Sequence, residues 1–133
     1  MDWSGSTKYQ MLFNNAVATW NSYTNGIIRK DTATTINDVT IKDYSSKDDI
    51  YKAYTTKSGY IMFNIYKIDS LNDSNTYVSN ALKEDVMLHE LGHALGLGHT
   101  THSWDVMRDQ LIVSHIKPSL NDIASYNEAK KSY

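Results

Sequence analysis

The stretch HELGHALGLGH, residues 89–99, constrains this chain more than any other feature. It places His89 and His93 four residues apart, Glu90 beside the first of them, and Gly96 and His99 beyond the second. Four residues turn an α-helix by about 400°, so the two imidazoles share one face with about 6 Å of rise between them. Glycine at position 96 permits the left-handed residue that ends a helix and returns His99 towards the same point. The spacing therefore predicts three converging histidines.

Three converging imidazoles match what a zinc ion needs. Zinc binds imidazole nitrogen at about 2.0–2.1 Å, and a catalytic site has three protein ligands with a fourth position open to water. The chain has no cysteine, so the ligands must be His or carboxylate. The alternatives are a chance surface cluster and a buried polar network, and a buried network without a metal is costly. We predict zinc ligation by His89, His93 and His99, with Glu90 acting on the water as a base.

Periodicity along the rest of the chain predicts an α+β fold. Residues 6–23 have apolar positions three or four apart, with Ser6 or Thr7 as the helix cap and Gly26 as the breaker. Residues 81–95 are apolar on most sides, which predicts a buried helix. The remaining runs predict strands at 26–32, 38–45 and 59–69, loops at 70–80 and 96–118, and a last helix at 119–133.

Composition narrows the class of protein. The chain has 133 residues, enough for one domain with one core. Its net charge is −2 and its lysines are dispersed, which argues against a nucleic-acid partner. No run of apolar residues is long enough to span a membrane. The first ten residues, MDWSGSTKYQ, lack the features of a signal peptide, which fits a mature or trimmed segment of a longer product.

HELGHALGLGH resembles the long zinc motif of the metzincin clan of metalloproteases, and most closely that of the matrixin branch. Gluzincins take a glutamate from a later helix as third ligand, and snapalysin-like proteins have Asp where His99 stands here. Metzincins also place a methionine in a tight turn beneath the metal, and SWDVM puts Met107 eight residues after His99. The resemblance extends to AVATWNSY, with Trp20 buried, and to LNDIASY, with Asp122 tied to the backbone of the methionine turn.

The resemblance implies a zincin-type catalytic domain spanning residues 1–133. A small twisted mixed sheet would pack on a long active-site helix, with one further helix near each end of the chain and a cleft between 1–97 and 98–133. The segment 59–68 would be the edge strand that lines this cleft. Substrate would then be bound by three residues of that strand and three of segment 108–119, the latter giving an apolar preference: Tyr60, Met62, Asn64, Leu111, Ile112 and Val113.

The chain also departs from the matrixin pattern. It begins too late to supply convincingly the strand that matrixins have before the first helix. It has no histidine ahead of the active-site helix for a second, structural zinc, and His102 and His115 are expected at the surface. Asp69 and Asp73 offer carboxylates for calcium, although a solvated turn is the favoured interpretation.

The sequence thus predicts an endopeptidase with one zinc ion that cleaves extended or unfolded polypeptides. Relatives of the matrixin type are largely secreted, so the resemblance implies secretion. A zinc-binding but latent or non-catalytic peptide-binding module is the alternative, and Glu90 argues against it because a structural site needs no base. An aminopeptidase would need a subsite for a free amino end, and the sequence shows none. The substrate, the activation route and the oligomeric state stay open.

Overall fold

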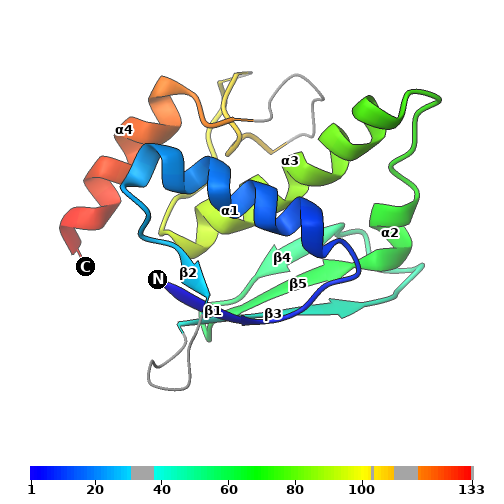
Figure 1. Cartoon of the computed structure of the whole chain (residues 1–133). Coiled ribbons are helices and arrows are strands. Elements are labelled where there is room, and N and C mark those ends of the chain that lie inside the picture. Colours follow the sequence, from blue (N-terminus) through cyan, green and yellow to red (C-terminus); the bar gives the residue numbers. More distant parts are fainter. Residues whose placement is uncertain (31–37, 103, 110–116, 133) are drawn as a thin grey trace.

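A single mixed sheet forms one layer of the molecule. The computed structural model describes residues 1–30, 38–102, 104–109 and 117–132 (Figure 1). The strands are β1 (Asp2–Gly5), β2 (Arg29–Lys30), β3 (Val39–Tyr44), β4 (Ala53–Thr55) and β5 (Tyr60–Asn64). Their order in the sheet is β2-β1-β3-β5-β4, and every neighbouring pair is parallel except β4 with β5. Strand β4 is therefore an edge of the sheet, whereas β5 is paired on both sides.

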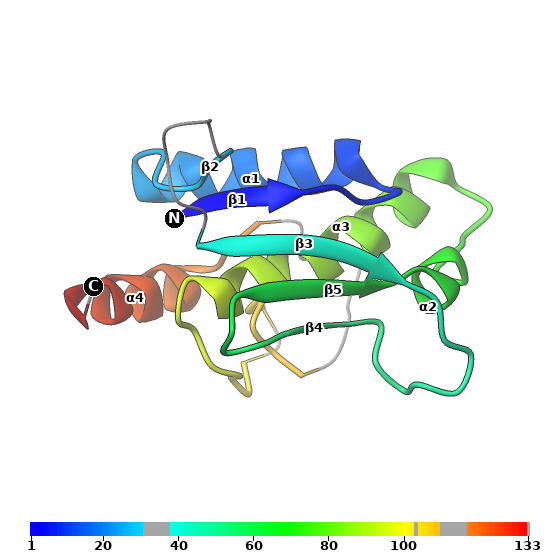
Figure 2. The same cartoon turned by 90° about the horizontal axis from the view of Figure 1, so that it is seen from below.

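Two long helices cover one face of the sheet. Helices α1 (Gln10–Thr24) and α3 (Thr76–Ala94) lie together on that face (Figures 1 and 2). The indole of Trp20 on α1 is fully buried, as predicted, and its Nε1 donates to the carbonyl of Leu88 on α3 at 2.9 Å. Shorter elements complete the fold: α2 (Ile65–Asp69), α4 (Leu120–Ala129) and the 3₁₀ turn η1 (Lys130–Ser132). The predicted α+β class is confirmed.

Several strand predictions are corrected. The chain does supply a strand before the first helix, because β1 pairs with β2 on one side and β3 on the other. Strand β4 was not predicted, since three residues are too few to show a period of two. The predicted strand at 59–69 ends at Asn64, and α2 begins directly after it. Asn64 is buried, and its side-chain amide donates to the carbonyls of Ser46 and Tyr51, so its contacts serve the preceding loop.

The helix boundaries also differ from the predicted ones. Helix α3 begins at Thr76 rather than near residue 81, and its cap is Asn75, whose side chain accepts from the backbone of Tyr77 and Val78. This first turn is polar and Tyr77 is exposed, so apolar periodicity does not mark it. Helix α1 begins at Gln10 without a side-chain cap. Its end is close to the expected position, with Asn25 and Gly26 both at positive φ.

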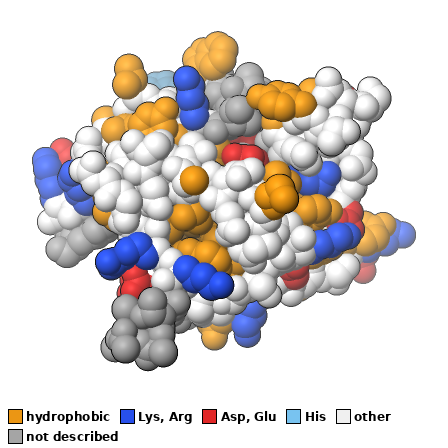
Figure 3. All heavy atoms as spheres, viewed as in Figure 1, with side chains coloured by type: hydrophobic (Ala, Val, Ile, Leu, Met, Phe, Trp, Pro, Cys, Tyr) orange, Lys and Arg blue, Asp and Glu red, His pale blue; other side chains and the backbone are white. Residues whose placement is uncertain are grey.

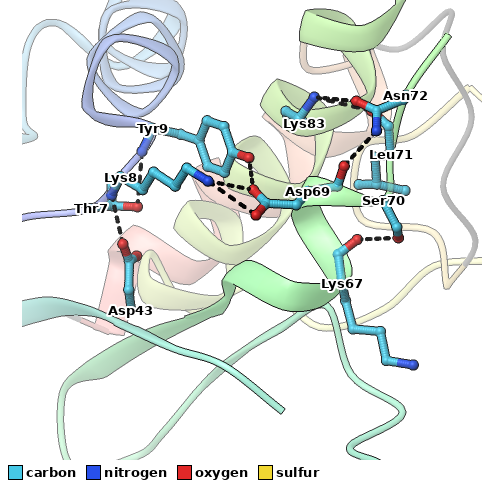
Figure 4. Close-up of polar contacts among 10 residues, drawn as sticks. All are labelled: Thr7, Lys8, Tyr9, Asp43, Lys67, Asp69, Ser70, Leu71, Asn72 and Lys83. Atoms are coloured by element: carbon cyan, nitrogen blue, oxygen red, sulfur yellow. Dashed lines mark hydrogen bonds and ion pairs between the residues drawn. The ribbon is translucent and has the colours of Figure 1, made fainter. Parts of the chain in front are cut away.

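Ionic contacts tie the start of α1 to α2 (Figure 4). The Nζ atom of Lys8 lies 3.0 Å from Asp69 Oδ2, and the hydroxyl of Tyr9 donates to the same carboxylate. The backbone N–H of Lys8 also donates to Asp43 Oδ2 at 2.6 Å, at the end of β3. These contacts fix the N-terminal end of α1 relative to α2 and the sheet.

The loop after α2 is held by a lysine from α3. The Nζ atom of Lys83 donates to the carbonyl of Leu71 at 3.2 Å and to Asn72 Oδ1 at 3.3 Å, and Figure 4 shows it beside this loop. Lys83 is buried, so its ammonium group places a positive charge directly beside the loop oxygens. Asp69 is engaged with Lys8 and Tyr9, and Asp73 accepts from the backbone of Asn75. Calcium binding by Asp69 and Asp73 stays a prediction.

The surface around α1 mixes hydrophobic, charged and polar side chains. Figure 3 shows hydrophobic side chains interspersed with Lys and Arg and with polar atoms on this face. Isolated exposed apolar side chains, such as Met11, are ordinary in globular proteins. In the part of the chain that the structure describes, no helix combines the length and the apolar character needed to cross a membrane.

Candidate metal centre

Helix α3 supplies two of the three histidines. His89 and His93 are four residues apart near its C-terminal end, and their Nε2 atoms lie 3.0 Å from one another. The helix is held by apolar residues that point into the core, among them Val86, Met87, Leu88 and Leu91. The predicted shared face is therefore present, and the burial of the helix fixes where both rings point.

The end of α3 brings in the third histidine. Gly96 has a φ of +98°, the left-handed conformation that glycine adopts without steric cost. The N–H of Gly96 donates to the carbonyl of His93, and the N–H of Leu97 donates to that of Gly92. These two bonds form a Schellman motif, which terminates the helix and redirects the chain. His99 Nε2 consequently lies 3.1 Å from His93 Nε2, and the predicted convergence is confirmed.

The other nitrogen of each ring has its own partner. Each Nδ1 donates to an oxygen: that of His89 to the carbonyl of Val106 at 2.7 Å, that of His93 to the carbonyl of Leu97 at 2.8 Å, and that of His99 to Asp109 Oδ1 at 2.6 Å. A carbonyl only accepts, so Nδ1 carries the proton in the first two rings. Their Nε2 lone pairs then face one point, as in metal-bound histidines.

The three nitrogens fit a zinc ion. Ligand atoms at 2.0–2.1 Å from a tetrahedral zinc are about 3.3 Å apart. The Nε2 atoms here are separated by 3.0 Å, 3.1 Å and 3.2 Å. Lone pairs directed at one another repel unless a cation lies among them, which is the physical reason to assign a metal. Among the described residues, His89, His93 and His99 form the one group with this geometry.

Burial shifts the pKa values of two groups here, His89 and Glu90. Burial lowers the pKa of His89 to about 4. The hydrogen bond to the Val106 carbonyl opposes this shift, and the positive charges of the nearby histidines and Arg108 add to it. The imidazole is therefore neutral at pH 7, the form that binds metal. Glu90 is only 5% exposed, and burial raises its pKa to about 7, although a hydrogen bond from Thr55 opposes the shift.

An open cleft of about 570 Å³ leads to the histidines. One wall is the segment 50–57, which contains β4, and the floor comes from α3. Its other charged lining residues include Asp85 and Arg108, which form a buried ion pair at 3.3 Å beside His89. The three histidines and Glu90 thus line the same open cleft.

The prediction that segment 59–68 is an edge strand is wrong. Strand β5 is not an edge, because β3 and β4 already use its backbone groups on both sides. Of its predicted contact residues, Asn64 is buried and Tyr60 lies beneath the ammonium of Lys42; neither these two nor Met62 lines the cleft. The other predicted contacts, Leu111, Ile112 and Val113, lie outside the described residues.

Met107, the residue predicted for the methionine turn, packs against α3. It is fully buried, and a Cβ atom added at Gly92 would lie 2.2 Å from its Sδ. The tie from Asp122 is confirmed, because Asp122 Oδ2 accepts from the N–H of Val106 at 2.8 Å. The role of Met107 in supporting a metal stays a prediction.

Sequence reasoning did not name several residues of the cleft, among them Asp85, Thr55 and Arg108. Asp85 lies four residues before His89, so helical spacing places both on one face and could have indicated it. Thr55 and Arg108 carried no such signal, because β4 was not recognised and residue 108 lies in irregular chain. His102 is exposed, as expected for a surface residue, and His115 lies outside the described residues.

Comparison with known proteins supports the fold. No protein-family model matches the chain, and neither does any curated protein. Among solved structures, it is similar to archaemetzincin from Methanopyrus kandleri, with a TM-score of 0.70, 11% identity and coverage of 98% of this chain and 96% of that one. It is also similar to a chain in the GM1-bound form of the ECX AB5 holotoxin, with a TM-score of 0.68, 14% identity and coverage of 98% and 79%. The chain therefore shares the α+β fold of these two structures.

Proposed function

We propose that this chain is a zinc-dependent endopeptidase that hydrolyses peptide bonds in extended polypeptides. The observation that carries the proposal is the triangle of Nε2 atoms, 3.0–3.2 Å on a side, in a cleft that also contains Glu90. His89, His93 and His99 would hold one zinc ion. The presence of a carboxylate beside a site open to the cleft favours catalysis over a purely structural metal.

Different residues of the chain would hold the metal, act as the base and orient the ligand rings. Zinc held by the three histidines would supply a Lewis acid and would lower the pKa of a bound water to about 7. Glu90 takes the proton of the attacking water and delivers it to the nitrogen of the departing amine. The Nδ1 partners, Val106 and Leu97, keep the ligand rings oriented through this step.

Strand β4 is the element that we propose to pair with substrate. The N–H of Asn64 donates to the carbonyl of Lys52, and the N–H of Thr56 donates to that of Tyr60. In an antiparallel ladder, alternate residues turn their backbone groups to opposite sides, so those of Ala53 and Thr55 point away from β5. An extended peptide could add to this edge and cross the metal centre.

The test compares hydrolysis of an unfolded protein and of a quenched peptide library by the wild type, by Glu90→Ala and by chelator-treated protein, with zinc content measured in each. We expect one zinc per chain in wild type and Glu90→Ala, with hydrolysis in the wild type alone. Such a result would show that Glu90 is needed for hydrolysis and not for zinc binding.

The competing function is a zinc-binding module that is latent or binds peptide without cleaving it. A folded, zinc-loaded wild type that cleaves nothing in the library would favour this function. Loss of zinc from Glu90→Ala would also count against the proposal, because it would make Glu90 part of the metal site rather than the base.

Three finer assignments belong to the same proposal. The motif HELGHALGLGH and Met107 support membership of the matrixin branch. Secretion is inferred from that resemblance, and a single domain over residues 1–133 is inferred from the one sheet and its two covering helices. Measuring the cellular location of the full product tests the second of these.

A further inference from the structure

Glu90 is held by a hydroxyl group on the edge strand. Thr55 Oγ1 lies 2.9 Å from Glu90 Oε1 and 3.2 Å from the carbonyl oxygen of the same residue. Glu90 is buried, Thr55 is half-buried, and both line the cleft. We propose that Thr55 is a positioning residue for the general base, an inference that rests on the proposed function.

The sheet fixes where the Thr55 hydroxyl lies. Thr55 is opposite Ile61 in the β4–β5 ladder, and the next residue donates its N–H to the carbonyl of Tyr60 at 2.8 Å. Successive side chains of a strand point to opposite faces, and here Ala53 and Thr55 are half-buried while Tyr54 between them is exposed. Threonine is also branched at Cβ, which restricts its χ1 rotation. The hydroxyl is therefore held by backbone pairing rather than by a flexible side chain.

This contact selects one orientation of the Glu90 carboxylate. A glutamate side chain has three rotatable bonds, and a hydrogen bond at Oε1 leaves Oε2 as the basic oxygen. The hydroxyl has a single proton, and its second acceptor, the Glu90 carbonyl, lies on the same residue. Because substrate is proposed to pair with β4, the same strand would position both the peptide and the base. Orientation of this kind acts on the chemical step more than on substrate binding.

The experiment replaces Thr55 with Val, which preserves the branched shape and removes the hydroxyl. We expect kcat to fall roughly ten- to a hundredfold, as for loss of a hydrogen bond to a charged group, with KM changed by less than about twofold. Thr55→Ser retains the hydroxyl and is expected to keep kcat within about threefold of the wild type. Thr19→Val, on α1 and away from the cleft lining, is the matched control and is expected to match the wild type.

A double-mutant cycle separates positioning from general disruption of the cleft. Glu90→Asp shortens the side chain and withdraws the carboxylate from Thr55. If Thr55 acts through Glu90, Thr55→Val should change kcat by less than about twofold in the Glu90→Asp background. An equal loss in both backgrounds would overturn the inference, and so would a loss confined to KM.

A structural readout makes the inference independent of activity. We expect a crystal structure of Thr55→Val to show Glu90 in a different rotamer or in several, with zinc content and thermal unfolding close to those of the wild type. Glu90 in an unchanged single rotamer would overturn the inference. If the wild type itself is inactive, the proposed function fails, and this structural comparison alone decides whether Thr55 anchors Glu90.

Discussion

At the scale of single residues, α3 packs closely against its neighbours beside the candidate metal centre. Gly92 lies on α3 one residue before His93, and a Cβ atom there would meet Met107 Sδ at 2.2 Å and Trp20 at 3.3 Å. The absence of a side chain at this position lets Met107 pack directly against the helix. Gly98 is in the same region, but an added Cβ would meet nothing within 4 Å.

We therefore predict that Gly92→Ala destabilises the zinc-free chain. Overpacking costs about 1–3 kcal/mol, of which a better helix propensity recovers up to about 1 kcal/mol. Urea unfolding measures the difference. Gly98→Ala is the control and should change the free energy of unfolding by less than about 0.5 kcal/mol. Equal effects of the two substitutions would contradict the close contact with Met107.

A second residue-scale prediction concerns acid stability. Asp105 is buried, which by itself raises its pKa, but hydrogen bonds from Ser119, Thr100 and Asn121 outweigh burial and lower the pKa below its usual 3.8. A carboxyl with a lowered folded-state pKa contributes stability that is present above pH 3.8 and is lost as the pH falls through the folded-state value.

The comparison of wild type with Asp105→Asn should show this dependence. We expect the wild type to be more stable at pH 6, and its advantage to shrink below about pH 4 as Asp105 is protonated. Urea unfolding of the zinc-free proteins across this range measures it. An advantage that stays constant as the pH falls would show that Asp105 contributes through shape rather than charge.

At the scale of elements, the start of α4 is linked to His89 on α3 through Val106. Helix α4 begins at a capping box in which Ser119 and Asp122 satisfy each other's backbone. The same Asp122 carboxylate accepts from the N–H of Val106, whose carbonyl accepts from His89. The start of α4 thus supports a metal ligand through one intermediate residue.

Removing this support should weaken metal binding. Asp122→Ala is expected to cost about 2–4 kcal/mol of stability, since it removes a cap and leaves buried donors without an acceptor. We also predict a weaker affinity for zinc, about tenfold or more, as seen when outer partners of metal ligands are changed. Calorimetric titration with zinc measures this effect. Glu128→Ala on the exposed side of α4 should leave the affinity unchanged.

The edge strand gives the second element-scale prediction. The N–H of Ala53 points away from β5, so Ala53→Pro removes a donor from the substrate side and leaves the β4–β5 ladder in place. We expect kcat/KM for extended peptides to fall by roughly tenfold, mainly through KM. Thermal unfolding checks the fold. Unchanged kinetics in a folded variant would exclude pairing of substrate at this edge.

At the scale of the whole molecule, we expect the fold to be stable without zinc and to gain stability when zinc binds. Among the described residues, twenty buried apolar side chains form one core, so we expect the fold to form without the metal. Zinc bound only to the folded state would add about 4 kcal/mol at a thousandfold excess over Kd.

Chelation should accordingly lower the melting temperature without unfolding the protein at 25 °C. Thermal scans with and without zinc, followed by circular dichroism, measure this shift. In His93→Ala the shift should be largely lost. A chain that unfolds completely on chelation would show instead that the metal is part of the folding core.

The sequence by itself determined the candidate metal centre and the kind of fold that holds it. The positions of His89, His93 and His99 follow from helical periodicity and from one glycine, because both are local rules of the backbone. Burial of Trp20 and the tie from Asp122 to Val106 were also expected, through the resemblance to metzincins.

Only the tertiary structure decided which strand lines the cleft and what holds Glu90. Strand β4 has three residues, and whether β4 or β5 is the edge depends on the order of pairing, which alternation within one strand does not encode. The contacts of Thr55 with Glu90 and of Arg108 with Asp85 join segments 35 and 23 residues apart in sequence. Such contacts arise from packing between elements, so the sequence pattern specifies the ligands, and the assembled sheet specifies the groups around them.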